Sequence, residues 1–124
     1  MAILARLGGL STFLVVGLFC LGSYGAPVYG GEVSMTIVNI ETPQGVKIWV
    51  PESIFAKKGD TVKLKLINKL DAEHGFKIAA FGVEKVVKAQ AAEDVSFTAD
   101  KAGVFPISCQ LHPPHVAGQL VVLE

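Results

Sequence analysis

The chain has 124 residues, enough for one small domain behind a leader segment. Its eleven Lys and Arg residues balance eleven Asp and Glu residues, so it lacks both the basic excess typical of nucleic-acid-binding proteins and the acidic excess of a disordered tail. Two cysteines and three histidines exclude a disulfide-dense fold, a four-cysteine zinc site and a cysteine-ligated iron–sulfur cluster within one chain.

The start of the chain has the pattern of a secretory signal peptide. A positive charge at Arg6 precedes the uncharged apolar run Leu7–Leu21, and small residues follow before Ala26. We therefore expect residues 1–25 to be removed and residues 26–124 to form one domain. That domain would be periplasmic or otherwise exported, with no stable membrane insertion after cleavage. The alternative is an uncleaved anchor helix, which is disfavoured because the apolar run is shorter than the ~20 residues that span a bilayer.

Cleavage of the leader leaves one cysteine in the exported domain. Cys20 lies in the leader, so Cys109 is the remaining thiol. A lone thiol forms no internal disulfide, which leaves three roles: a buried inert residue, an intermolecular crosslink, or a metal-binding or reactive thiolate. The loss of Arg6 lowers the formal charge only to −1, and we expect no nucleic-acid partner.

Most of the remaining chain alternates apolar and polar residues with a period of two, which is typical of half-buried β-strands. The alternating apolar positions are Val33, Met35 and Ile37; Val46, Ile48 and Val50; Val62, Leu64 and Leu66; Val95 and Phe97; Phe105, Ile107 and Cys109; and Leu120 and Val122. Turn-forming residues separate these runs, as in Pro43–Gly45, Lys58–Asp60 and Asp100–Gly103. The pattern predicts an all-β fold, an antiparallel β-sandwich. The segment Val83–Ala92 has apolar residues at helical spacing and allows a short helix.

The candidate functional residues are Cys109 and the three histidines of the chain. Cys109 ends an alternating strand, and His112 and His115 follow it at successive intervals of three residues. His74 lies upstream in a polar turn. We predict that all four side chains converge at one end of the sandwich. One thiolate and two imidazoles, with a weaker axial ligand, form a trigonal site that holds copper in both of its oxidation states.

Other chemistries stay open from these residues alone. A zinc ion held by one cysteine and three histidines is chemically permissible. A lone cysteine is often an inert small hydrophobe in a protein core. A Cys–His nucleophile pair needs an oxyanion hole and an orienting group, and the sequence has no motif for either.

Several longer stretches resemble the cupredoxins, and among them the nitrosocyanin group of red copper proteins. The resemblance is carried by Pro51–Ser53, Lys57–Asp60, Ala80–Val83, Ser96–Gly103 and Cys109–Pro113. It implies a cupredoxin-like Greek-key β-sandwich, with strand and turn rather than helix over Val83–Ala92. It also implies a periplasmic site for one copper ion per chain.

The resemblance assigns metal ligands position by position. Cys109 matches the thiolate ligand of the cupredoxins, and His112 matches an imidazole ligand. His115 has the same relation to Gly118 that the second histidine of the red copper proteins has to a glycine. His74 stands where red copper proteins have a glutamate ligand and blue copper proteins have their upstream histidine. No methionine follows His115, so the usual axial thioether of blue copper sites is missing.

The sequence favours a periplasmic electron carrier, because His74 restores the residue type of ordinary cupredoxins. Redox partner proteins would dock at an exposed imidazole edge ringed by apolar residues. The residues expected in that ring are Val116, Ala117, Phe76 and Phe81. The alternative is a red copper centre with an open coordination position that binds or converts a nitrogen oxide. A third hypothesis is a role in copper storage or delivery, which the absence of a Met-rich or His-rich tract makes less favoured.

Overall fold

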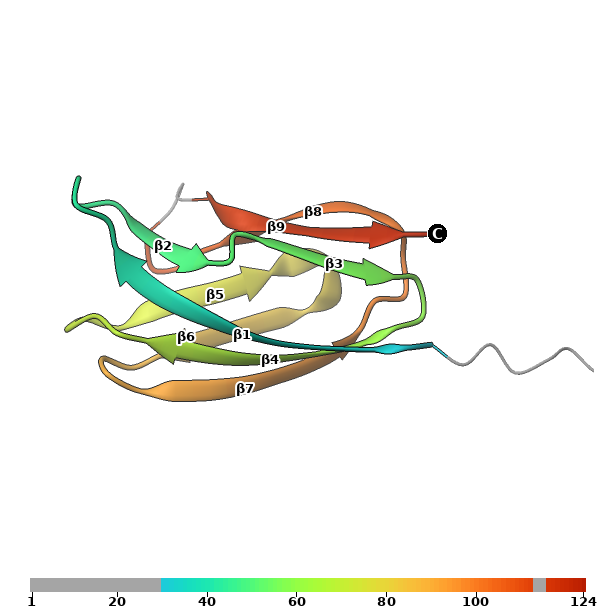
Figure 1. The fold of residues 1–124 in the computed structure, drawn as a ribbon, viewed down its shortest axis with the longest axis horizontal. Helices are drawn as coiled ribbons and strands as arrows, with labels where there is room; N and C mark the ends of the chain where they lie inside the picture. The colour runs from blue at the N-terminus through green and yellow to red at the C-terminus, as the bar shows by residue number, and fades with distance from the viewer. Residues whose placement is uncertain (1–29, 113–115) are drawn as a thin grey trace, which may run out of the picture.

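A computed structural model of the chain describes residues 30–112 and 116–124, which form two β-sheets stacked as a sandwich (Figure 1). The strands are β1 (Glu32–Glu41), β2 (Lys47–Val50), β3 (Ser53–Lys57), β4 (Thr61–Asn68), β5 (His74–Ile78), β6 (Val83–Val87), β7 (Ala92–Thr98), β8 (Gly103–Ser108) and β9 (Val116–Leu123). One turn of 3-10 helix, η1 (Ala79–Phe81), joins β5 to β6. Within the described ranges, no helix has the length and apolar character needed to cross a membrane.

The two sheets are mixed rather than wholly antiparallel. One has the strand order β2-β1-β4-β7, and the other has the order β3-β9-β8-β5-β6. Among the pairs of described strands, β1 with β4 and β3 with β9 run parallel, and the other pairs are antiparallel. The predicted all-β sandwich is confirmed, with this correction to its strand directions. The parallel pairs arise because the chain crosses to the opposite sheet between the paired strands, and parallel neighbours need such a crossover.

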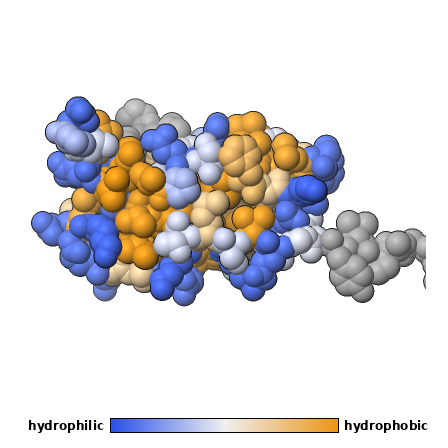
Figure 2. All heavy atoms as spheres, viewed as in Figure 1, coloured by the Kyte–Doolittle hydropathy of each residue, from blue (hydrophilic) through white to orange (hydrophobic). Residues whose placement is uncertain are grey.

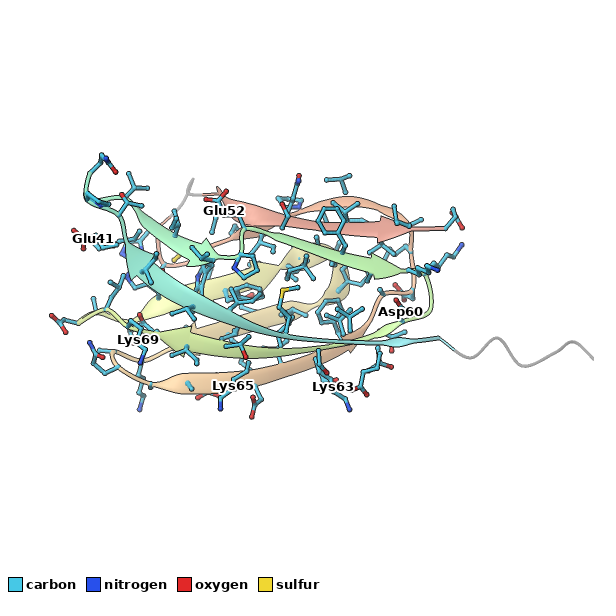
Figure 3. All side chains as sticks on the ribbon, in the orientation of Figure 1. Glu41, Glu52, Asp60, Lys63, Lys65 and Lys69 are labelled. Carbon is cyan, nitrogen blue, oxygen red and sulfur yellow. The ribbon has the colours of Figure 1, made fainter. Side chains whose placement is uncertain are left out.

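The core lies between the sheets, and β4 shows how the sequence builds it. Val62, Leu64 and Leu66 are buried between the sheets. Lys63 and Lys65 alternate with them and extend into solvent (Figure 3). Full burial of one such aliphatic side chain stabilises the fold by roughly 1.5–3 kcal/mol.

Two segments differ from the simplest pattern. In β2 the buried residue is Trp49, while Val46 before the strand and Val50 at its end are exposed. Val46 and Val50, marked by the alternation as apolar positions, therefore do not face the core. The segment Val83–Ala92 is not a helix: it forms β6, a turn and the first residue of β7, as the cupredoxin resemblance implies.

The connections gather at two opposite ends of the sandwich (Figure 1). One end carries the β1–β2 turn, the β4–β5 loop and the segment that follows β8. The other end carries the β3–β4 turn, which contains Asp60. Figure 3 shows Glu41 at the first end and Asp60 at the second. The predicted ligands in the described residues all lie at the first end.

Candidate metal centre

Three of the four predicted ligands lie together. The ligand atoms of His74, Cys109 and His112 are all within 4.8 Å of one another. His74 and Cys109 are buried, whereas His112 is exposed. The two imidazole rings have centroids 5.4 Å apart and planes inclined by 38°. His115 lies outside the described residues, so its part in this cluster stays a prediction.

A tight turn brings His112 back to Cys109. β8 ends at Ser108, and Cys109 follows it at the end of the sandwich. The backbone N–H of His112 donates to the Cys109 carbonyl at 3.2 Å, which closes a turn over these residues. The turn places Nδ1 of His112 3.4 Å from Sγ of Cys109. The Cys-x-x-His spacing is thus sufficient to pair the thiol with one imidazole.

A buried asparagine holds the loop that leads into His74. Asn68, the last residue of β4, donates through Nδ2 to the Ala72 carbonyl at 2.8 Å and to the Val87 carbonyl at 3.1 Å. Its Oδ1 accepts the backbone N–H of Leu70 at 3.0 Å. His74 then begins β5 and pairs with Val87 of β6. Asn68 therefore ties the loop to the strand that faces His74.

Gly75 supplies a hydrogen-bond donor to the cysteine sulfur. Its backbone N–H donates to Sγ of Cys109 at 3.2 Å, and its carbonyl accepts the indole N–H of Trp49 at 3.1 Å. Both interactions are buried. A Cβ at this position would overlap the side-chain amide of Gln110, so only glycine fits without a rearrangement. Sequence reasoning missed Gly75 and Trp49. The one available signal was a glycine directly after a candidate ligand.

The imidazoles adjoin a hollow at the end of the sandwich. It has a volume of about 380 Å³ and is lined by Val46, Lys47, Ala72, His74 and His112. The candidate centre is therefore exposed at His112 and buried at His74 and Cys109.

The apolar ring expected around the imidazole edge is wrong in most of its members. Phe76 is fully buried in the core, and Ala117 is buried as well. Phe81 packs instead against Phe97 and Phe105, with ring centroids 5.4 and 4.9 Å away. The structure gives no description of the Val116 side chain. Two exposed apolar residues are near the site: Leu111 precedes His112 in the sequence, and Val46 lines the hollow beside the imidazoles.

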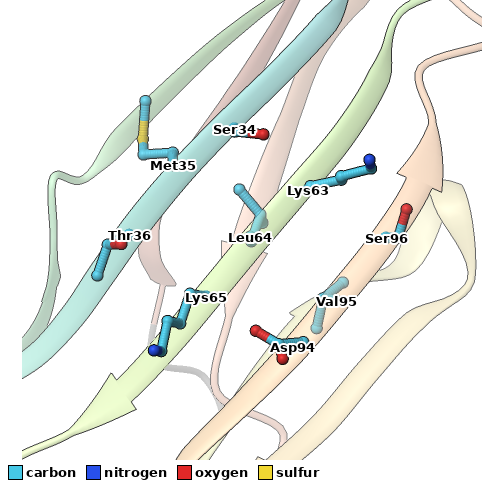
Figure 4. Close-up of a pocket in the computed structure, with 9 residues that line it drawn as sticks. All are labelled: Ser34, Met35, Thr36, Lys63, Leu64, Lys65, Asp94, Val95 and Ser96. Atoms are coloured by element: carbon cyan, nitrogen blue, oxygen red, sulfur yellow. The ribbon is translucent and has the colours of Figure 1, made fainter.

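A larger hollow of about 460 Å³ lies on the outer face of the four-stranded sheet (Figure 4). It is lined by Ser34, Met35, Thr36, Lys63, Leu64, Lys65, Asp94, Val95 and Ser96. None of these residues is a histidine or cysteine, and none belongs to the cluster of His74, Cys109 and His112. Figure 2 shows that apolar side chains are also distributed over the visible surface, as is usual for a folded protein.

The donor set decides which metals suit the cluster. In the described part of the chain, no carboxylate belongs to the group of side chains close enough to hold an ion. One sulfur and two imidazole nitrogens suit copper in either oxidation state. The same donors with a further ligand also suit zinc. The geometry therefore fits copper or zinc and excludes neither.

A model of the cupredoxin-like domain family matches residues 13–122. Among solved structures, the chain is similar to a copper nitrite reductase from Nitrosomonas europaea, with a TM-score of 0.61 and 22% identity over 74% of this chain and 41% of that one. It is also similar to the multicopper oxidase mgLAC, with a TM-score of 0.59 and 17% identity over 75% of this chain and 39% of that one. The chain thus spans about two fifths of the length of each structure. A comparison with curated protein sequences gives no match.

These comparisons confirm the resemblance to the cupredoxins as a whole. The structural likeness, at these low identities, concerns the fold alone. The closer likeness to the nitrosocyanin group is tested by none of them and stays a prediction. The boundary between leader and domain also stays a prediction, because residues 1–29 lie outside the described residues.

Proposed function

This chain belongs to the cupredoxin-like domain family, and from that premise we propose that it is an exported copper protein that carries electrons. One copper ion per chain would be held by His74, Cys109 and His112. The ion would supply one-electron chemistry by alternating between Cu(I) and Cu(II). The chain's own residues would hold the ion in a nearly constant environment, so that little reorganisation accompanies each transfer.

The observation that carries this proposal is the arrangement of the three donor atoms within 4.8 Å of one another. Two of the three side chains are buried, and packing therefore restricts their rotamers. A donor set that is already gathered needs little movement to accept an ion. The histidine at the upstream position, in place of a glutamate, supports a site of the blue copper type.

The exposed imidazole of His112 supplies a route for electrons. Val46 and Leu111 are exposed, and Val46 lines the hollow beside this imidazole. A redox partner protein would contact this end through apolar surface, because the small net charge gives little long-range steering. Truncation of the apolar side chain in Val46→Ala should then slow electron transfer to a partner without changing the reduction potential.

The first test is the visible absorption and EPR spectra of the purified protein loaded with Cu(II). A trigonal site of His74, Cys109 and His112 predicts an intense blue band and narrow copper hyperfine splitting. His115→Ala should keep both features, while His74→Ala, the matched removal of one imidazole, should lose them. Copper that cannot be reduced and reoxidised without loss from the protein would contradict the carrier proposal.

A second candidate is a red copper centre with an open coordination position that binds or converts a nitrogen oxide. The hollow of about 380 Å³ beside both imidazoles supports it, because a small molecule has room there. This candidate requires His115 as a strong ligand, as the resemblance to the nitrosocyanin group implies. It predicts a red or yellow protein with wide hyperfine splitting that is lost in His115→Ala. A Cu(II) spectrum unchanged by azide and by nitric oxide would contradict it.

Metal content and location have their own tests. Metal analysis of the protein purified from its native compartment should find copper at one equivalent per chain, and zinc at that ratio would favour the alternative metal.

The mass of the exported protein should correspond to a chain that begins at Ala26. A chain that keeps residues 1–25 in the membrane fraction would support the anchor alternative.

A further inference from the structure

We propose that Trp49 is a positioning residue for the candidate copper centre: its indole fixes the Gly75 backbone so that the Gly75 N–H donates to the Cys109 sulfur. The consequence for the copper rests on the proposed function. The positioning itself concerns the protein alone and is measured without metal.

The first contact joins the two sheets. Trp49 belongs to β2 of the four-stranded sheet, and Gly75 belongs to β5 of the five-stranded sheet. The indole N–H of Trp49 reaches across the core to the Gly75 carbonyl at 3.1 Å. The ring of Phe76 meets the indole edge-to-face, with centroids 5.7 Å apart and planes at 86°. Because Trp49 is nearly fully buried, this packing gives the indole one well-defined orientation.

The second contact joins the same glycine to the ligand. The N–H of Gly75 donates to Sγ of Cys109 at 3.2 Å, in a buried environment. The carbonyl and the N–H lie on either side of one Cα, so holding the carbonyl restricts the direction of the N–H. Glycine has no side chain that packing can hold, and its backbone has the widest choice of conformations. An external hydrogen bond from Trp49 is therefore an effective restraint on Gly75.

The sheet holds Gly75 opposite Val86 of β6, while its own carbonyl and N–H bond to Trp49 and Cys109. The side chain of Gln110 lies so close that a Cβ on Gly75 would overlap its amide. Gln110 is itself held through Nε2, which donates to the Lys85 carbonyl at 2.9 Å. Gly75 is thus enclosed by Gln110 on one side and anchored by Trp49 on another, with its N–H directed at the sulfur.

A donor at the sulfur has a defined electronic effect. Hydrogen bonds around a ligand cysteine tune the reduction potential of a copper site. An N–H donor withdraws electron density from the thiolate, which favours the reduced ion and raises the potential. Weakening the bond in a buried site, where hydrogen bonds are stronger than in water, should lower the potential and shift the thiolate-to-copper absorption band.

The test compares Trp49→Phe with Phe76→Leu. Trp49→Phe keeps an aromatic ring and removes the indole N–H. Phe76→Leu disturbs the same aromatic contact and keeps that N–H, so it is the matched control for lost packing. In the metal-free protein we expect the Gly75 amide to exchange its hydrogen about five-fold faster in Trp49→Phe, as the loss of one restraining hydrogen bond implies. Phe76→Leu should not change it relative to neighbouring amides.

Copper-loaded samples give the second readout. Trp49→Phe should lower the reduction potential and shift the thiolate band, and Phe76→Leu should change neither at comparable stability. Equal shifts in the two variants, or a Trp49→Phe variant that changes only the unfolding free energy, would overturn the proposal.

Two further measurements keep the result decisive. If Trp49→Phe does not fold, hydrogen exchange is measured in the wild-type protein instead. The anchoring predicts that the indole N–H of Trp49 and the amide of Gly75 are protected from exchange with solvent to the same degree. An indole N–H that exchanges as fast as a free indole would overturn the anchoring. If the wild-type protein binds no copper, the proposed function fails, while the metal-free exchange of Gly75 still decides whether Trp49 positions it.

Discussion

The two ends of the sandwich both bury polar side chains, and they arrange them in opposite ways. At the end away from the cluster, both carboxylate oxygens of Asp60 accept backbone N–H groups, one from Gly31 at 2.7 Å and one from Lys57 at 2.8 Å. At the other end, Cys109 and His74 direct their ligand atoms toward each other and toward His112. At the Asp60 end the buried carboxylate is paired with backbone N–H groups, whereas at the cluster end three ligand atoms lie around one position.

The difference separates a structural polar group from a functional one. Asp60 satisfies donors of the backbone that lie in its own turn and in the segment before β1, so its role is to close that end of the fold. The donors of the cluster end are a sulfur atom and imidazole nitrogens from two segments, the start of β5 and the turn after β8, and they are of the type that suits a transition metal. Burial of polar atoms alone would not distinguish the two ends.

The largest expected effect comes from Cys109→Ser. The hydroxyl is a poor replacement for a thiolate ligand, so the intense thiolate-to-copper absorption should be lost completely. The loss of stability should be small, because the side chain keeps nearly the same volume and the buried hydroxyl can accept the Gly75 N–H that now donates to the sulfur. Absorption spectra with added Cu(II), beside thermal unfolding, measure both effects. A variant that keeps the intense band would contradict Cys109 as the ligand.

Asn68→Ala should affect both the stability and the site. The change removes the hydrogen bonds that hold the β4–β5 loop and leaves buried backbone groups unpaired, at a cost of about 3 kcal/mol. Because this loop leads into His74, the copper EPR spectrum should also broaden. Denaturant unfolding and EPR of the same sample test the prediction, with Asn68→Asp as the variant that keeps the Oδ1 acceptor. An unchanged spectrum would mean that the loop does not position His74.

Asp60→Ala should lower the stability by about 2 kcal/mol and leave the copper spectra as they are. The lost acceptors serve only backbone donors at the far end of the sandwich. Denaturant unfolding measures the loss, and Asp60→Asn, which retains one carbonyl oxygen, should show part of it. A change in the copper spectra would show that the two ends are coupled and would break the comparison.

The smallest effect is expected at an exposed pair near the Asp60 end. A hydrogen bond from Lys63, and a second from Ser34, lower the pKa of Glu32. The contribution of Glu32 to stability is therefore present above the usual glutamate pKa and is lost as the pH falls through its lowered value. Glu32→Gln should flatten this part of the stability–pH curve only slightly, because the pair is exposed. Unfolding at several pH values measures this change. A loss of stability in Glu32→Gln larger than that in Asp60→Ala would show that surface charge stabilises this end more than Asp60 does.

The strands and half of the site were predictable from local patterns. Alternation along β4 placed Val62, Leu64 and Leu66 in the core, since a strand directs successive side chains to opposite faces. The predicted convergence of Cys109 and His112 has a local cause, because a single turn returns the chain on itself. These features depend on residues that are close in sequence, so the sequence contains their cause.

Other features were decided by contacts between distant segments. In β2, alternation marked Val46, Ile48 and Val50 as the apolar positions, but the buried side chain is Trp49. Its contacts with Phe76 and Gly75, which are distant in sequence, decide this orientation. The parallel pairing of two strand pairs likewise follows from how the sheets stack. By itself the sequence determined the strands with regular alternation and the resemblance to the family, and it marked the candidate ligands. Only the tertiary structure decided how Trp49 holds Gly75 and how Gly75 reaches the cysteine sulfur, because these contacts join β2 of one sheet, β5 of the other and the turn after β8.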